Sequence, residues 1–239
     1  QNEQELYILD QRINDRGVRI DKVFAENAVK LDEIYKNECK NEAIRLTGLE
    51  NVNSVSQLKS WVEDQLGENI ESLNKESIKT LYDTTENEEV KKMLYLRSQM
   101  SKTSVKKYSA MLRSLGKDNR VRGITQFYGA SRTGRWAGRI IQPQNLPQNH
   151  LADLETARKI VKYGDFELFK ILYDNIPNVL SELIRTAIIP SEGRIFIVSD
   201  FSAIEARVIA YLAGEQCRME VFKNGGDIYC ASAAQMFKV

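Results

Sequence analysis

Asp200 is the residue whose type and position could support metal chemistry. It follows the apolar run Ile-Phe-Ile-Val at residues 195–198, and a helical pattern begins after it at Ile204. A carboxylate at the C-terminal end of a buried strand, beside the first turn of a helix, is well placed to bind a divalent cation. It would do so through hard oxygen ligands and would share the cation with substrate phosphates. We therefore expect Asp200 to be a metal ligand.

The same residues also have a purely structural interpretation. Ser202 to Glu205 fits a capping box, in which Ser202 is the N-cap, Glu205 closes the box and Asp200 simply ends a strand. Because a strand, an aspartate and a helix often follow one another, this short pattern alone favours the structural interpretation.

The whole string is more specific. Residues 200–207, Asp-Phe-Ser-Ala-Ile-Glu-Ala-Arg, resemble the first palm motif of family A DNA polymerases, usually written Asp-Tyr-Ser-Gln-Ile-Glu-Leu-Arg. Three positions differ from this motif, and the differences resemble those of the bacteriophage-type branch of the family: Phe201, Ala203 and Ala206. Five positions match: Asp200, Ser202, Ile204, Glu205 and Arg207.

A second string lies upstream, where Thr-Gly-Arg at 133–135 is followed after eight residues by Gln-Asn-Leu-Pro at 144–147. On its residues alone, the segment 129–139 is a generic basic loop. The string resembles the Thr-Gly-Arg to Gln-Asn-Ile-Pro segment of the same polymerase family. This implies that Arg135, Gln144 and Asn145 contact the primer-template minor groove near the 3′ end, with Thr133 beside them. Donors there sense acceptors common to all correct base pairs.

The resemblance also implies a nucleotidyl-transfer site that uses two Mg²⁺ ions. Asp200 would be a ligand to both ions, and the backbone carbonyl of Phe201 would join the second. Glu205 would block the ribose 2′ hydroxyl so that deoxynucleotides are chosen. Ser202 and Ile204 would complete this side of the nucleotide pocket.

Tyr229 belongs to a third resemblance. Asp227-Ile228-Tyr229 is similar to the Gly-x-Asp-Ile-His element of the family, in which the histidine faces the incoming triphosphate. Tyr229 stands in place of that histidine. A phenol can still donate a hydrogen bond but brings no positive charge.

Charge is strongly segregated along the chain. Residues 1–90 carry 11 Lys and Arg against 20 Asp and Glu, residues 91–150 carry 13 against 1, and residues 151–239 carry 10 against 12. The middle segment also contains interleaved Tyr, Phe and Trp residues, which indicates nucleic-acid binding rather than solubility alone. Each cation that neutralises a phosphate releases counterions, so affinity should fall steeply with salt.

The first half of the basic segment fits the thumb of the family, which grips the duplex backbone. Short hydroxyls beside cations suit phosphate oxygens, and the predicted contacts here are Lys102, Thr103, Ser104 and Lys106. Arg207, at the end of the palm motif, completes the predicted DNA contacts.

Composition excludes several classes of protein. With 42% apolar residues the chain can bury a core as one large domain or two smaller ones. It contains no apolar run of about 18 residues and no apolar signal core, so we expect no membrane association and a cytoplasmic location. His150 is the only histidine, and the three cysteines lack metal-site or disulfide spacing: Cys39, Cys217 and Cys230.

Periodicity and capping signals predict the elements. The first predicted helix, at 5–14, would carry Leu6, Leu9 and Ile13 on its apolar face, and Asp21 would cap the second, at 22–46. Residues 148–186 are an insertion relative to the shorter bacterial pattern and predict three further helices. The other predictions are helices at 5–14, 22–46, 52–67, 72–83 and 87–115, an extended segment at 119–129 and a loop at 129–139.

We therefore expect an α+β chain that is mainly helical and forms an incomplete family A polymerase fold. Residues 1–118 would form the N-terminal helices and the helical thumb. Residues 119–239 would form a partial antiparallel palm sheet carrying the insertion.

The resemblance implies a DNA-directed DNA polymerase that acts on primer-template DNA and dNTPs. The fingers helix, the His-Asp-Glu segment with the second metal carboxylate, and the upstream exonuclease-like domain are not found, so we expect this fragment to be inactive alone. Two alternatives remain: a non-catalytic fragment that binds primer-template, and a subunit of a split polymerase. A metal-dependent nuclease would need clustered acids or a histidine, whereas the acids of residues 116–191 are scattered.

Overall fold

The computed structural model describes residues 2–103 and 105–238, so the predicted phosphate contact Ser104 lies outside the described residues. The chain forms two units, Gln1–Gly193 and Arg194–Val239. No described helix is long and apolar enough to cross a membrane.

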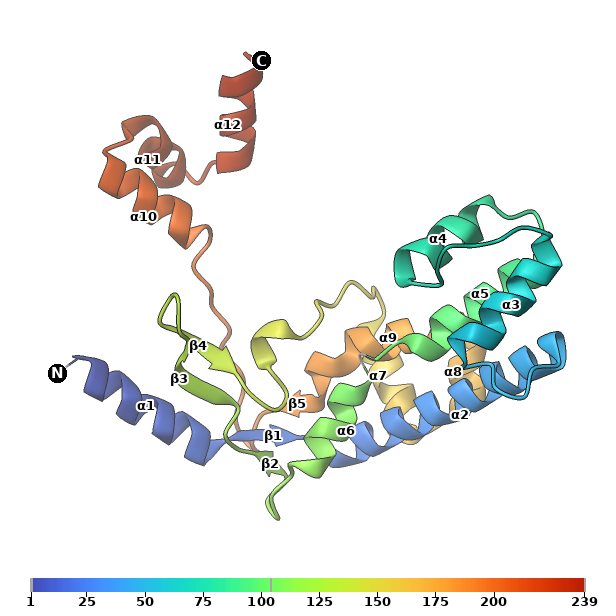
Figure 1. Ribbon diagram of the computed structural model, residues 1–239. Coiled ribbons are helices and arrows are strands. Elements are labelled where there is room, and N and C mark those ends of the chain that lie inside the picture. The colour runs from blue at the N-terminus through green and yellow to red at the C-terminus, as the bar shows by residue number, and fades with distance from the viewer. Residues whose placement is uncertain (1, 104, 239) are drawn as a thin grey trace. The chain divides into compact units, whose positions relative to one another are not determined.

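Helix α2 (Lys22–Thr47) organises the first unit. Its N-cap is Asp21, whose side chain accepts a hydrogen bond from the Phe24 backbone N–H (3.3 Å), and its C-cap is Gly48 with φ of 69°. Both signals are local in sequence, and the helix predicted at 22–46 is confirmed. Figure 1 shows α2 running beside α5 (Glu88–Ser101), α6 (Lys106–Arg113), α7 (Leu154–Tyr163) and α9 (Ile176–Glu182), against all of which it packs.

Helix α1 (Asn2–Arg16) leads through β1 (Val18–Ile20) into α2. β1 is the centre of a three-stranded antiparallel sheet, between β2 (Arg120–Val121) and β5 (Ile188–Ile189). A separate antiparallel pair is formed by β3 (Thr125–Ala130) and β4 (Arg135–Gly138). These sheets confirm the predicted α+β class. Whether residue 118 divides the functional parts stays a prediction.

Strand β4 lies inside the segment 129–139, for which a loop was the expectation. That prediction was wrong for residues 129–130, which end β3, and for residues 135–138, because Thr125 pairs with Gly138, Gln126 with Ala137 and Ala130 with Arg135. Pairing reduces the connection to a tight turn at 131–134. The hairpin register, set by partners on the other strand, overrides the small and Gly-rich composition.

A second core lies under α3 (Val55–Leu66), α4 (Lys75–Thr84) and α5 (Glu88–Ser101). Their N-caps are Ser54, Asn74 and Asn87, each of which accepts a backbone N–H. Trp61 of α3 packs against this core in a half-buried position, as its place in an apolar stripe indicates. The two helices predicted at 52–67 and 72–83 are confirmed.

The helix predicted at 87–115 is wrong as a single element. It is divided into α5, which ends at Ser101, and α6 (Lys106–Arg113). Lys102 has extended backbone; its carbonyl accepts from the Lys36 ammonium (3.1 Å), and its own ammonium donates to Asn175 Oδ1 (2.9 Å). These partners lie far away in the sequence, and no glycine or proline marks the break.

Three helices occupy the insertion, as predicted: α7 (Leu154–Tyr163), α8 (Phe166–Leu172) and α9 (Ile176–Glu182). Gly164 ends α7, and Asp165 caps α8. The short 3₁₀ helix η2 (Leu183–Ala187) follows.

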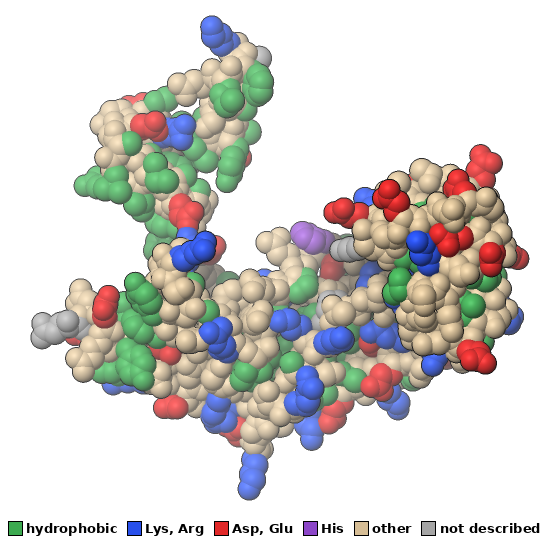
Figure 2. All heavy atoms as spheres, in the orientation of Figure 1, with side chains coloured by type: hydrophobic (Ala, Val, Ile, Leu, Met, Phe, Trp, Pro, Cys, Tyr) green, Lys and Arg blue, Asp and Glu red, His purple; other side chains and the backbone are tan. Residues whose placement is uncertain are grey.

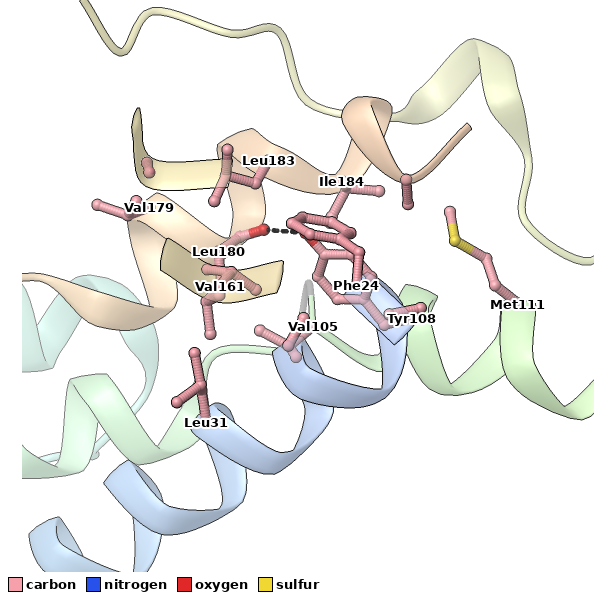
Figure 3. Close-up of a cluster of buried hydrophobic side chains, with 14 of the residues drawn as sticks. Phe24, Leu31, Val105, Tyr108, Met111, Val161, Val179, Leu180, Leu183 and Ile184 are labelled. Carbon is pink, nitrogen blue, oxygen red and sulfur yellow. Dashed lines mark hydrogen bonds between the residues drawn. The ribbon is translucent and has the colours of Figure 1, made fainter. Parts of the chain in front are cut away.

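The insertion is part of the main core. Figure 3 shows Tyr108 of α6 donating its hydroxyl hydrogen bond to the Leu180 carbonyl of α9 (2.7 Å). Fully buried side chains from α2, α6 and the insertion pack around this bond, among them Phe24, Met111, Val161, Phe169, Leu183 and Ile184. Each buried aliphatic or aromatic side chain contributes about 1.5–3 kcal/mol. The insertion therefore stabilises the first unit.

The second unit consists of α10 (Ile204–Ala213), α11 (Gln216–Lys223) and α12 (Ile228–Phe237). The buried strand predicted before Asp200 is not present: residues 194–200 form neither strand nor helix, and Ile197 and Val198 are each 89% exposed. A strand needs a neighbour for its N–H and C=O groups. None of the residues 2–103 and 105–238 pairs with this segment.

Candidate functional site

Asp200 is exposed and precedes α10 by a short turn. Its Oδ1 accepts a hydrogen bond from the Phe201 backbone N–H (2.9 Å). One oxygen is thus held in place, and the carboxylate stays accessible to solvent and to ligands. The Phe201 side chain is also exposed.

The capping box expected in the structural interpretation does not form. The N-cap of α10 is Ala203, with φ of 52° and no side-chain cap. Instead, Arg207 Nε donates to the Ser202 carbonyl (2.8 Å), and its guanidinium lies 4.4 Å from the centre of the Phe222 ring. Arg207 therefore holds the turn that follows Asp200 against α10 and α11. Its predicted contact with DNA stays a prediction.

The predicted nucleotide-binding residues all lie in the second unit and are exposed: Ser202, Ile204, Glu205 and Tyr229. Asp227 has a structural role in this element, because its Oδ1 accepts from the N–H groups of Tyr229 (2.7 Å) and Cys230 (3.1 Å) and caps α12. The cap places Tyr229 in the first turn of α12.

The donors for a metal ion fit Mg²⁺ in type but form only part of a site. Asp200 and the Phe201 carbonyl are hard oxygen donors, as Mg²⁺ requires. Within the described ranges, no group of three or more His, Cys, Asp and Glu side chains could hold a metal ion. The Asp200 carboxylate is thus accessible, and it belongs to no group of three or more such side chains in the described part of the chain.

The hairpin β3–β4 and the following 3₁₀ helix η1 (Pro143–Asn145) bring the second string together. Thr133 and Arg135 are exposed at the hairpin turn, and Gln144 and Asn145 are exposed on η1. A Cβ on Gly138 would lie 2.5 Å from Gln144 Oε1, so this amide lies directly against β4. The predicted minor-groove residues therefore belong to one continuous structure.

Asp10 anchors this hairpin, and the sequence reasoning missed it. It is 2% exposed, and its Oδ1 accepts from Thr125 Oγ1 (2.7 Å) and Trp136 Nε1 (2.8 Å). Asn14 adds reciprocal bonds to the Thr125 backbone (2.9 and 3.0 Å). The only signal in the sequence was the spacing of four between Asp10 and Asn14, two residues of α1 with short polar side chains.

The helix α1 correspondingly turns the expected apolar face outward. Leu6, Leu9 and Ile13 are exposed, whereas Asp10 is buried. The predicted helix is confirmed, and its apolar face is the exposed one. The hydrogen bonds of Asp10 and Asn14 to the hairpin determine which face is buried.

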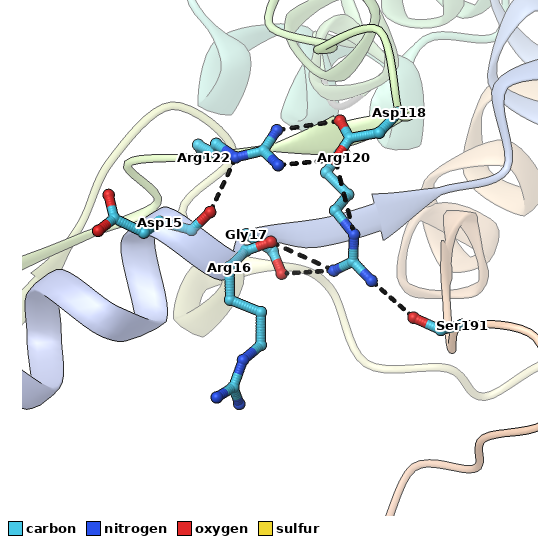
Figure 4. A network of polar contacts seen from close by, with 7 residues as sticks. All are labelled: Asp15, Arg16, Gly17, Asp118, Arg120, Arg122 and Ser191. Carbon is cyan, nitrogen blue, oxygen red and sulfur yellow. Dashed lines mark hydrogen bonds and ion pairs between the residues drawn. The ribbon is translucent and has the colours of Figure 1, made fainter.

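Two cations of the basic segment have structural roles (Figure 4). Arg120 donates to the carbonyls of Arg16 (3.2 Å) and Gly17 (3.1 Å) and to Ser191 Oγ (2.6 Å). Arg122 donates to the Asp15 carbonyl (2.8 Å). These bonds satisfy carbonyls at the C-terminal end of α1.

Arg122 is also paired with Asp118, with its NH2 group 2.6 Å from Oδ2. The hydrogen bonds from the Arg122 guanidinium lower the pKa of Asp118 to about 2. The single acid of the basic segment is thus paired with a cation of the same segment.

Other cations of the segment are available for phosphates. Four are exposed, and their side chains make no hydrogen bond or ion pair with described residues: Lys106, Arg113, Lys117 and Arg132. Lys102 is half-buried and bonded to Asn175, while Thr103 is exposed. Within the first unit, Figure 2 shows acidic side chains gathered at the α3–α4 end and Lys and Arg side chains predominating below the hairpin and α6.

Comparison with known proteins gives a family match over most of the chain. The model of DNA polymerase family A matches residues 22–239. The DNA polymerase of Bacillus phage SP02 is 59% identical over all 239 residues, which cover 37% of that relative. DNA polymerase I of Borreliella burgdorferi is 26% identical over 233 residues, or 95% of this chain and 22% of the relative.

A solved structure agrees with this match. The POL domain of Pol1 from M. smegmatis, in complex with DNA primer-template and dNTP, aligns with a TM-score of 0.60 and 19% identity. The alignment covers 94% of this chain and 36% of that one, and it shows similarity of fold alone. The chain thus spans little more than a third of the phage relative and of this structure.

Proposed function

The chain belongs to DNA polymerase family A, and from this premise we propose that it forms the primer-template-holding part of an enzyme for template-directed DNA synthesis. The observation that carries the proposal is the 59% identity to a phage DNA polymerase over all 239 residues, which include both motif strings. The substrates would be primer-template DNA and dNTPs.

The DNA-holding surface would combine groove and backbone contacts. Arg135, Gln144 and Asn145 would donate to minor-groove acceptors near the primer 3′ end, since they project from the hairpin and from η1, which packs on it. The exposed cations Lys106 and Arg132 would neutralise phosphates. Groove contacts then sense pair geometry, and phosphate contacts supply salt-dependent affinity.

The Asp200 carboxylate and the Phe201 carbonyl would hold Mg²⁺. When bound, Mg²⁺ neutralises phosphate charge and favours an oxygen nucleophile for in-line displacement. Glu205 would exclude the ribose 2′ hydroxyl, and the exposed Tyr229 phenol would donate to a triphosphate oxygen. Positioning and charge neutralisation would thus do most of the catalytic work.

We infer further that the 239-residue polypeptide binds primer-template but does not extend it alone. Its accessible aspartate belongs to no group of three or more metal-binding side chains among the described residues, and the resemblance to family A implies a second metal carboxylate. This favours a binding role for the isolated chain, or a polymerase completed by a second polypeptide.

Two assays on the same protein test the proposal. Fluorescence anisotropy with a labelled primer-template should show affinity that falls steeply with salt, is unchanged by Asp200→Ala and is weakened by Arg135→Ala. Gel-based extension with Mg²⁺ or Mn²⁺ should show no product. Salt-insensitive or absent binding would refute the DNA-holding role, and robust extension abolished by Asp200→Ala would refute the inferred inactivity.

A further inference from the structure

Tyr128 has an unusual backbone conformation for an aromatic residue. Its φ is 51°, in the left-handed region, and it lies where the register of β3 against β4 shifts between Gln126 and Ala130. Its side chain is 54% exposed. Strained residues of this kind persist only where surrounding contacts hold them, and they gather at functional sites.

The Tyr128 ring lies directly on Gly134, in the hairpin turn. A Cβ on Gly134 would be 2.7 Å from Tyr128 Cε2 and 3.0 Å from Cζ, and Gly134 itself has φ of 66°. The N–H groups of Thr133 and Gly134 both donate to the Ala130 carbonyl (3.1 and 2.9 Å). The turn is therefore closed by backbone bonds on one side and covered by an aromatic ring on the other.

The rest of the hairpin has independent anchors. The Phe127 ring contacts the Trp136 ring (5.6 Å between centroids) and the Tyr7 ring (6.0 Å), and Trp136 is bonded to Asp10. The Tyr128 ring also contacts the Phe127 ring (6.1 Å between centroids), whereas the contacts of Trp136 with Phe127 and Asp10 do not involve Tyr128 and would remain without its ring. The ring covers the turn that ends at Arg135, the first residue of β4.

We propose that Tyr128 is a positioning residue for Arg135. By covering Gly134 it fixes the turn, so that the Arg135 guanidinium is presented at one place to the minor-groove acceptor of the primer-terminal base pair. This inference rests on the proposed function. Beyond that function, it assigns a role in DNA recognition to Tyr128, whose side chain acts through Gly134 and need not touch DNA.

The test measures groove recognition separately from general DNA affinity. The 239-residue chain is titrated with two primer-templates that differ only in the terminal primer base, adenine or 3-deazaadenine, which lacks the N3 acceptor. Tyr128→Gly removes the ring and tolerates the positive φ, so the hairpin backbone can persist. Tyr128→Phe keeps the ring, and Tyr163→Ala, at a tyrosine 85% exposed on α7, is the matched control.

Wild type, Tyr128→Phe and Tyr163→Ala should bind the adenine terminus about tenfold more tightly than the 3-deazaadenine terminus, as loss of one hydrogen bond to a charged donor implies. Tyr128→Gly should reduce this ratio to about 1–2 with an unchanged salt slope. If Tyr128→Gly discriminates between the two primer termini by the same ratio as wild type, the inference is overturned. Salt-dependent binding with no discrimination in wild type overturns it while the DNA-holding role stands; absence of binding overturns both.

Discussion

Asp21 joins the start of α2 to α7, and its replacement separates two local effects on stability. The carboxylate is 6% exposed; Oδ1 caps α2, and Oδ2 accepts from Arg158 NH2 (2.7 Å) and Lys162 Nζ (2.8 Å). Asp21→Asn keeps an oxygen for the cap but removes the charge. Asp21→Ala removes both.

The expected loss of stability depends on how exposed the two partners of Asp21, Arg158 and Lys162, are. Removing one member of a buried ion pair costs about 3–5 kcal/mol when the other stays buried. Here the Arg158 and Lys162 side chains are 25% and 48% exposed and can be hydrated, so Asp21→Asn should cost about 2–3 kcal/mol. Loss of the cap in Asp21→Ala should add about 1 kcal/mol.

Urea denaturation at pH 7, followed by far-ultraviolet circular dichroism, measures these losses. With a urea m-value of about 3 kcal/mol/M, the midpoint should fall by about 0.7–1 M in Asp21→Asn. The matched control is Asp165→Asn, because Asp165 caps α8 through the Leu168 N–H without an ion pair among the described residues. Its midpoint should hardly change. Equal losses in Asp21→Asn and Asp165→Asn would refute the assigned ion pairs.

Acid should remove the Asp21 contribution. Burial would raise the pKa of Asp21, but hydrogen bonds from Lys162 and the Phe24 N–H and the charges of Lys162 and Arg158 outweigh it and lower the pKa below 3.8. The contribution of Asp21 to the free energy of unfolding is therefore fully present above pH 3.8 and is lost as pH falls through the folded-state pKa. In urea titrations, the difference in unfolding free energy between wild type and Asp21→Asn should be constant at pH 5–7 and shrink below pH 3.8. Tyr108→Phe should cost about 1–2 kcal/mol because the buried Leu180 carbonyl loses its donor, whereas Tyr163→Phe should leave the urea midpoint unchanged. Lys106→Ala should lower the slope of log K against log salt by about 1 for duplex DNA, and an unchanged slope would place this cation away from phosphate.

Capping signals explain why so much of the helical structure could be predicted. Asp21 and Gly48 bound α2, and Gly164 and Asp165 separate α7 from α8, because a cap and the N–H or C=O that it satisfies lie within a few residues. The motif strings likewise identified the family, because a match between strings depends only on the order of residues in the chain. These are properties of short stretches of chain.

Tertiary structure decided what depends on distant partners. Lys102 interrupts the predicted long helix through Lys36 and Asn175, and Asp10 is buried beneath the hairpin. The apolar run before Asp200 is exposed because a strand exists only where another strand pairs with it. Residue types thus determined the local elements and the available chemistry. Contacts across the sequence determined where helices break, which face is buried and which cations stay available for a ligand.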